Sequence, residues 1–260
     1  MKLQQIAYEK DNLLSYAEYG SPTGFPILIQ HGIIASIKGA AIFQQLLDMG
    51  TRLICIARPG YGESSPYEMK NIGAWGRIVS VLIDELRLSQ FDIFGISSGA
   101  PYAYAIGYAC PEKTRNIFIL SGIPALYDEK VLSFWPYGVK KDAAQTEMQT
   151  LARQIFFSSL SPEDLENDDI QDSMMNNCFG VAQDLRIRCM DWGFKLSDVQ
   201  SPVILRHSRA DESVPFAAAE ITAQLLPRCR LDIRENDGHF SQAIVDNFIK
   251  TSMAECYRKG

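Results

Sequence analysis

Short apolar runs typical of buried strands alternate with helical stripes along most of this chain. One of them, Arg52–Ala57, is the continuous apolar run of a buried parallel strand, and Phe91–Phe94 is a second predicted strand. Other predicted strands are Leu14–Tyr19, Pro26–Gln30, Asn116–Leu120, Pro202–Arg206 and Arg230–Ile233. Helical patterns lie between them, at residues 42–47, 75–86, 100–109, 214–226 and 242–253. This order predicts an α/β fold with a doubly wound, mostly parallel sheet. An antiparallel hairpin of Leu14–Tyr19 and Pro26–Gln30 is predicted to precede this sheet.

The segment between about Tyr127 and Leu196 interrupts the alternation. It contains helical patterns but no convincing strand, and one of its helices is predicted to begin at Ser161–Asp164, where Pro162 and two acids suit a first turn. We therefore expect a helical lid of residues 125–197 inserted into a core domain of residues 1–124 and 198–260.

Charge and composition exclude several classes of function. A net charge of -6 over 260 residues provides no basic surface for nucleic acid or anionic lipid. No apolar run approaches the ~20 residues of a membrane span, and Met1–Gln5 leads into charged residues without a signal-peptide pattern. The six cysteines have no metal-ligand spacing. We expect a cytoplasmic protein with reduced cysteines and a small-molecule substrate, needing no metal or cofactor; its oligomeric state is left open.

The strongest local signal is the GxSxG sequence of Gly95–Gly99. It follows a predicted strand and opens a predicted helix, which is the setting of a nucleophile elbow. In such a turn Ser97 adopts a strained backbone, and the two glycines let strand and helix pack closely. Ser97 is the predicted nucleophile.

A serine hydroxyl needs a base to accept its proton, and the chain has three histidines. His31 ends a strand and is expected to shape the following loop, whereas His207 ends a later strand and has a structural explanation. His239 lies in a loop between the last strand and the last helix. It is also the only histidine that matches the Ser…Asp…His chain order of this arrangement, so His239 is the predicted base.

The acid that orients the base is predicted to be Asp211, in the loop after the first strand beyond the lid. Its neighbour Glu212 lies nearer a helix start, where a capping role explains it. Asp237 is too close to His239 in sequence to reach around its ring.

Charge that develops on the substrate oxygen is best met by fixed backbone N–H groups. Ser98, directly after the nucleophile, is predicted to provide one of these groups, and Ile33, just after His31-Gly32, the other.

Several of these segments together resemble the α/β-hydrolase superfamily: His31-Gly32, Arg58–Ser64, the Ser97 elbow, Asp211 to Pro215 and Gly238-His239. The resemblance covers about two thirds of the chain and leaves out the lid. Relatives usually carry Asp where this chain has Ala57, a position that supports a loop. The resemblance implies acyl transfer through a serine ester, without a fixed substrate.

The expected reaction is hydrolysis of a carboxylic ester or thioester with a small apolar acyl group, which places the protein with the carboxylesterases. Alternatives with the same triad are a C–C bond hydrolase, a cofactor-free perhydrolase, or a ligand-binding receptor without turnover. Among the lid aromatics, Trp135, Phe156 and Trp192 are candidates for the substrate pocket.

Overall fold

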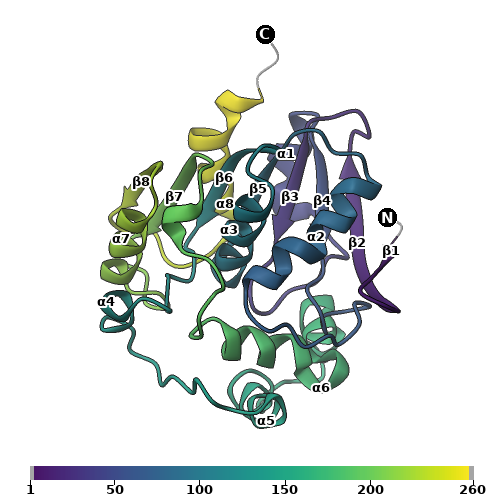
Figure 1. The fold of residues 1–260 in the computed structure, drawn as a ribbon, viewed down its shortest axis with the longest axis vertical. Helices are drawn as coiled ribbons and strands as arrows, with labels where there is room; N and C mark the ends of the chain where they lie inside the picture. The colour runs from purple at the N-terminus through teal and green to yellow at the C-terminus, as the bar shows by residue number, and fades with distance from the viewer. Residues whose placement is uncertain (1–2, 258–260) are drawn as a thin grey trace.

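The computed structural model describes residues 3–257, which form one eight-stranded sheet with helices on both faces (Figure 1). The strands are β1 (Leu3–Tyr8), β2 (Asn12–Gly20), β3 (Pro26–Gln30), β4 (Arg52–Ile56), β5 (Phe91–Ile96), β6 (Thr114–Leu120), β7 (Val203–Ser208) and β8 (Cys229–Arg234). Their order across the sheet is β1-β2-β4-β3-β5-β6-β7-β8. From β4 to β8 all neighbours are parallel, whereas β2 is antiparallel to both β1 and β4. The predicted mostly parallel, doubly wound sheet is confirmed.

The predicted hairpin between the first two apolar runs is wrong. β2 forms its hairpin with β1, a strand that sequence reasoning missed, and β3 lies between β4 and β5. The reason is hydrophobic cover: Ile27, Leu28 and Ile29 are all buried, so β3 needs neighbours and helices on both faces. An edge hairpin would not provide them.

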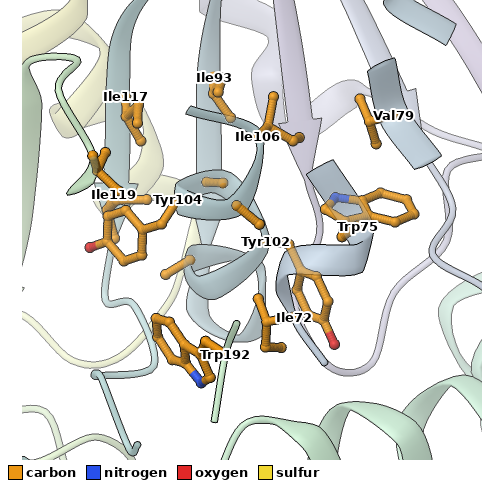
Figure 2. Close-up of a cluster of buried hydrophobic side chains, with 14 of the residues drawn as sticks. Ile72, Trp75, Val79, Ile93, Tyr102, Tyr104, Ile106, Ile117, Ile119 and Trp192 are labelled. Carbon is orange, nitrogen blue, oxygen red and sulfur yellow. The ribbon is translucent and has the colours of Figure 1, made fainter. Parts of the chain in front are cut away.

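Helices α2 (Gly73–Glu85), α3 (Ala100–Ala109) and α7 (Phe216–Leu225) pack on one face of the sheet, and α1 (Gln44–Asp48) and α8 (Gln242–Phe248) on the other. Alternate strand residues supply the two hydrophobic layers: Ile93 belongs to the α2–α3 side and Phe94 to the α8 side. Figure 2 shows side chains of the first layer, among them Ile93 and Ile117 on the strands and Trp75 and Ile106 on the helices that cover them. The two layers fix α3, and with it the turn at its start.

Between β6 and β7 the described chain contains helices α4 (Glu129–Leu132), α5 (Gln145–Phe156) and α6 (Asp168–Ile187), but no strand. Figure 1 shows α5 and α6 beyond one end of the sheet. The helix predicted to start at Ser161 does not: Ser161 and Asp164 bond to each other's backbone N–H, but only a short 3-10 turn follows. Asn167 caps α6 instead. The division into lid and core domains stays a prediction.

Helix α6 is interrupted near its middle. Asn176, Asn177 and Cys178 have φ values of 52°, 58° and 61°, in the left-handed region that side chains other than glycine rarely adopt. Asparagine tolerates this region better than most residues. Gln149 of α5 donates to the carbonyl oxygens of Asn176 and Asn177 at 3.0 Å each, which holds the turn. As a result α6 consists of two helical segments.

No helix within residues 3–257 is long and apolar enough to cross a membrane.

A buried ion pair joins the second segment of α6 to the sheet domain. Arg58, after β4, and Asp184 of α6 are almost wholly buried, and Arg58 Nη2 lies 2.6 Å from Asp184 Oδ2. The hydroxyls of Tyr61 and Tyr102 also donate to Asp184, at 2.9 and 2.5 Å. Burial raises the pKa of both tyrosines, so they remain protonated donors. The charges of Arg58 and Asp184 therefore balance each other, and the two tyrosine hydroxyls add hydrogen bonds to the Asp184 carboxylate.

The same guanidinium reaches the loop after β3. Arg58 donates to the carbonyl oxygens of His31 and Gly32 at 2.7 and 2.8 Å, while the Tyr61 hydroxyl, whose single proton is shared with Asp184, lies 2.9 Å from Ile33 O. Three successive carbonyls are thus held by side chains that also contact Asp184. The cluster fixes the loop after β3 and helix α6 together.

We predict that Asp184→Ala lowers the free energy of unfolding by about 3–5 kcal/mol, because it leaves the Arg58 charge buried without its partner. Urea denaturation measures the loss. The matched control is Asp84→Ala, which removes the exposed partner of Lys113 and should change stability little, because water solvates both groups. Similar losses in the two variants would contradict the argument.

Candidate active site

The GxSxG sequence forms the sharp turn that was predicted between β5 and α3. Ser97 has φ of 50°, in the left-handed region, directly after the extended Ile96. A Cβ atom on Gly99 would lie 2.1 Å from the carbonyl oxygen of Gln30, and one on Gly95 would lie 3.0 Å from Ala103 Cβ. Both positions exclude a side chain because strand and helix approach so closely. The turn leaves Ser97 partly exposed while its neighbours are buried.

A continuous chain of hydrogen bonds runs from Ser97 to Asp211 through His239. His239 Nε2 lies 2.9 Å from Ser97 Oγ, and His239 Nδ1 lies 2.8 Å from Asp211 Oδ2. Since a carboxylate only accepts, Nδ1 carries the proton and Nε2 is free to accept one from the serine hydroxyl. The structure brings together the three residues that the sequence singled out.

Asp211 is held in place by its own loop. Its Oδ1 accepts the backbone N–H groups of Ser213 and Val214 at 2.9 Å each, which leaves Oδ2 for His239. Burial alone would raise the pKa of Asp211, but the hydrogen bonds from His239 and Val214 outweigh it and lower the pKa. The side chain is therefore an ionised acceptor. Glu212, the neighbouring candidate, is exposed and makes no such contact.

Neither of the other two histidines hydrogen-bonds to the Ser97 hydroxyl among the described residues. His31 is buried, with Nδ1 2.8 Å from Gly32 O and Nε2 accepting the Arg58 N–H at 3.3 Å, so it shapes the loop. His207 is fully buried behind Asp211, with Nε2 2.9 Å from Val214 O and 3.4 Å from Asp211 Oδ2. His31 therefore supports the loop after β3, and His207 supports the loop that carries Asp211.

Ile33 and Ser98, the two residues predicted to supply backbone N–H groups, lie beside Ser97. Both line the same cavity as Ser97 and His239. Ile33 O accepts from Tyr61, whereas within residues 3–257 no protein atom accepts the Ile33 N–H. This arrangement is compatible with the predicted role, which stays a prediction.

Two cavities meet at the serine, and Ile33, Ser97 and His239 belong to the walls of both. The smaller, of about 620 Å³, lies between the loop after β3 and residues Asn167–Asp169. The larger, of about 960 Å³, is bordered by the segment after α4, by α5 and by the end of α6, and its wall contains Trp135 and Phe156, two of the predicted pocket residues. Both cavities are lined mainly by apolar side chains, as is usual for small-molecule sites.

Trp192, the third predicted pocket residue, lines neither cavity. It is fully buried, its ring packs edge-on against Tyr127, and its Nε1 donates to Arg188 O at 2.8 Å. Figure 2 shows it among the core side chains near Ile72. Aromatic character alone does not separate a core residue from a pocket residue, which is why the sequence misplaced it.

Sequence reasoning missed the residues that support the site from below. Asp184 gave one usable signal, an acid on a helix whose neighbours are mostly apolar, but its partner Arg58 lies 126 positions away.

Among residues 3–257, no group of three or more His, Cys, Asp or Glu side chains could hold a metal ion.

Comparison with known proteins identifies the family to which this chain belongs. The model of the family described as alpha/beta hydrolase fold matches residues 26–244, which is more than half of the chain. The chain belongs to the α/β-hydrolase fold family. It is thus an α/β-hydrolase enzyme.

The similar proteins include esterases and other hydrolases. A pimeloyl-[acyl-carrier protein] methyl ester esterase of Aromatoleum aromaticum is 26% identical over 212 residues, 74% of this chain and 82% of that protein. A 2-hydroxy-6-oxononadienedioate/2-hydroxy-6-oxononatrienedioate hydrolase of Cupriavidus pinatubonensis is 22% identical over 243 residues, 83% of this chain and 81% of that protein. An esterase from Exiguobacterium antarcticum has the same fold, with a TM-score of 0.71 and 18% identity over 98% of this chain and 99% of its own.

The buried histidines of this α/β-hydrolase make its stability depend on pH. Burial lowers the pKa of His31 well below its ordinary value, with Arg58 adding to the effect, and burial also lowers the pKa of His207. Below about pH 6.5 the unfolded chain binds protons at both positions, whereas the folded protein takes them up only at a lower pH. Stability is therefore lost as the pH falls.

We predict that the free energy of unfolding falls between pH 6.5 and 5 by up to about 1.4 kcal/mol per pH unit for each of these histidines. Urea unfolding at several pH values measures the slope. His207→Gln removes one titrating group, so its slope should be shallower than that of the wild type by about one histidine. An unchanged slope would show that His207 takes up its proton in the folded state.

Proposed function

We propose that this enzyme hydrolyses a carboxylic ester or thioester of a small, largely apolar acid through an acyl-enzyme on Ser97. The observation that carries the proposal is the hydrogen-bonded chain from Ser97 through His239 to Asp211. It gives a weak nucleophile a base at 2.9 Å and gives that base a fixed orientation.

In the first step His239 Nε2 takes the proton of Ser97 while Oγ forms a bond to the substrate carbonyl carbon. The resulting negative oxygen is stabilised by the backbone N–H groups of Ile33 and Ser98. His239 then gives its proton to the leaving alcohol or thiol, and the acyl group stays on Ser97. Asp211 remains ionised throughout and stabilises the imidazolium.

In the second step a water molecule replaces the leaving group. His239 accepts one proton of the water as its oxygen attacks the acyl carbon, and then returns a proton to Ser97 Oγ as the acid departs. One water is consumed for each ester bond cleaved. The two cavities that meet at Ser97 can hold the acyl and leaving groups on separate sides.

C–C bond hydrolysis is the second candidate, favoured by the likeness to the Cupriavidus hydrolase over most of both chains. The same serine and base could serve it. Turnover of 2-hydroxy-6-oxononadienedioate, compared with that of methyl and thiol esters of graded acyl length, decides between the two.

The chain is further inferred to act in the cytoplasm. All six cysteines are free thiols, four of them buried. Unpaired cysteines are typical of a reducing compartment.

We predict that Ser97→Ala lowers ester turnover by roughly 10⁴- to 10⁶-fold without a matching loss of stability, because only the hydroxyl is removed. Ser98→Ala is the matched control, since it keeps the backbone N–H of residue 98 and should retain most of the activity. Initial rates on the ester panel and thermal melts measure both variants. More than about a tenth of wild-type activity in Ser97→Ala would overturn the assignment.

We predict that dialysis against EDTA leaves ester turnover unchanged, because every step above uses only side chains, backbone and water. Assays before and after dialysis, with and without added Zn²⁺ or Mg²⁺, provide the measurement. A loss that added metal restores would contradict the mechanism.

A further inference from the structure

The larger cavity contains a cation without a carboxylate partner. Its wall includes two basic residues, Lys140 and Arg188, and no Asp or Glu among the described residues. Lys140 is paired with Glu147 at 2.6 Å. Arg188, at the end of α6, has no carboxylate of residues 3–257 within ion-pair distance. Its charge is therefore not balanced by a carboxylate beside a cavity lined mainly by apolar side chains.

The neighbours of Arg188 do not neutralise it. Its guanidinium carbon lies 5.3 Å from the centre of the Trp135 ring, a contact that favours the cation but leaves the Nε–H group without an acceptor. The guanidinium also hydrogen-bonds to the Cys189 sulfur, but burial raises the pKa of this thiol, which stays neutral and does not balance the charge.

Two N–H donors in this wall are buried without any protein acceptor, Arg188 Nε and Trp135 Nε1. Burying an N–H group without a hydrogen bond costs free energy, so native structures rarely leave one unmatched. Here two of them lie on residues in contact with each other, in the cavity that reaches Ser97. Both are donors, so the group that satisfies them must accept, and the guanidinium favours one with negative charge.

We propose that Arg188 and Trp135 bind a carboxylate at the end of the substrate's acyl chain, while the scissile carbonyl lies at Ser97. A carboxylate has two oxygens, one for the guanidinium and one for the indole N–H, and guanidinium geometry suits it. Apolar residues such as Met148, Leu151 and Phe156 line the same cavity and suit the intervening methylenes. The inference rests on the proposed function and narrows its substrate to half-esters of dicarboxylic acids.

The test uses monomethyl esters of straight-chain dicarboxylic acids with four to ten carbons, each compared with the dimethyl ester of the same acid. The two differ in one negative charge at matched length. We expect the wild type to have a kcat/KM at least tenfold higher for the monomethyl ester at the best length. Equal values at every length would overturn the proposal.

Arg188→Gln should lower kcat/KM for the preferred monomethyl ester by roughly 10- to 100-fold, the value of a hydrogen bond to a charged group. Its rate on the dimethyl ester should stay within about threefold. Trp135→Phe keeps a ring but removes the N–H, and should cause a smaller selective loss of roughly 3- to 10-fold. Equal losses on both esters would show that the two residues only pack the lid.

Arg186→Gln is the matched control. It removes the same charge two residues earlier on α6, but Arg186 pairs with Glu68 at 2.9 Å and does not line the cavity. It should leave the preference for the monomethyl ester unchanged. A loss of preference as large as that of Arg188→Gln would mean that general positive charge, rather than this site, attracts the acid.

Calorimetry on Ser97→Ala separates this inference from the proposed function and does not depend on turnover. We expect it to bind the preferred monomethyl ester at least tenfold more tightly than the dimethyl ester, and the added Arg188→Gln change to remove the difference. Esters hydrolysed without any preference for the carboxylate would overturn the inference and leave the proposed function standing. Selective binding without hydrolysis of any ester would do the reverse.

Discussion

The contact between Arg58 and Asp184 is the interaction on which the geometry of the site depends. It joins the strand that precedes Arg58 to α6, which carries Asp184, and the same guanidinium holds the carbonyls of His31 and Gly32. Separating two buried charges is costly, so these parts can move relative to one another only at a large penalty. The cluster therefore fixes the loop that contains Ile33 beside the serine. Tyr102, one turn into α3, extends it to the helix that follows Ser97.

A second constraint acts at the turn itself. Gly99 lies so close to Gln30 that the end of β3 and the start of α3 touch through backbone atoms. This closeness brings the loop after β3 next to the loop after β5, and the hydroxyl of Ser97 projects between them. The packing of α3 on the sheet and the Arg58–Asp184 ion pair thus both fix the position of the loop after β3 relative to Ser97.

The parts of this protein that could be predicted from sequence are those that local chemistry determines. Apolar runs identified seven strands, and the turn at Ser97 could be recognised because only glycine fits at Gly99. Asp211 and His239 could be assigned because few candidates compete for each role and their order along the chain is fixed. What escaped prediction depends on distant partners. β3 takes its place from its neighbours across the sheet, and nothing near Trp192 in sequence shows that its ring is enclosed by the core. The pairing of Arg58 with Asp184 spans half the chain and has no local signature.

The interruption of α6 divides the control of selectivity between two short segments. The part before it begins at Asp168 and Asp169, which line the smaller cavity, and the part after it carries Leu185 and ends beside Arg188, which line the larger one. Only the second segment is held by Arg58. A substitution in the first segment therefore changes one side of the substrate's surroundings without disturbing the anchor of the other. The two segments of α6 each border a different cavity and can vary independently. In evolution, the preference for the substrate group on one side of the scissile bond can therefore change while recognition of the group on the other side is kept.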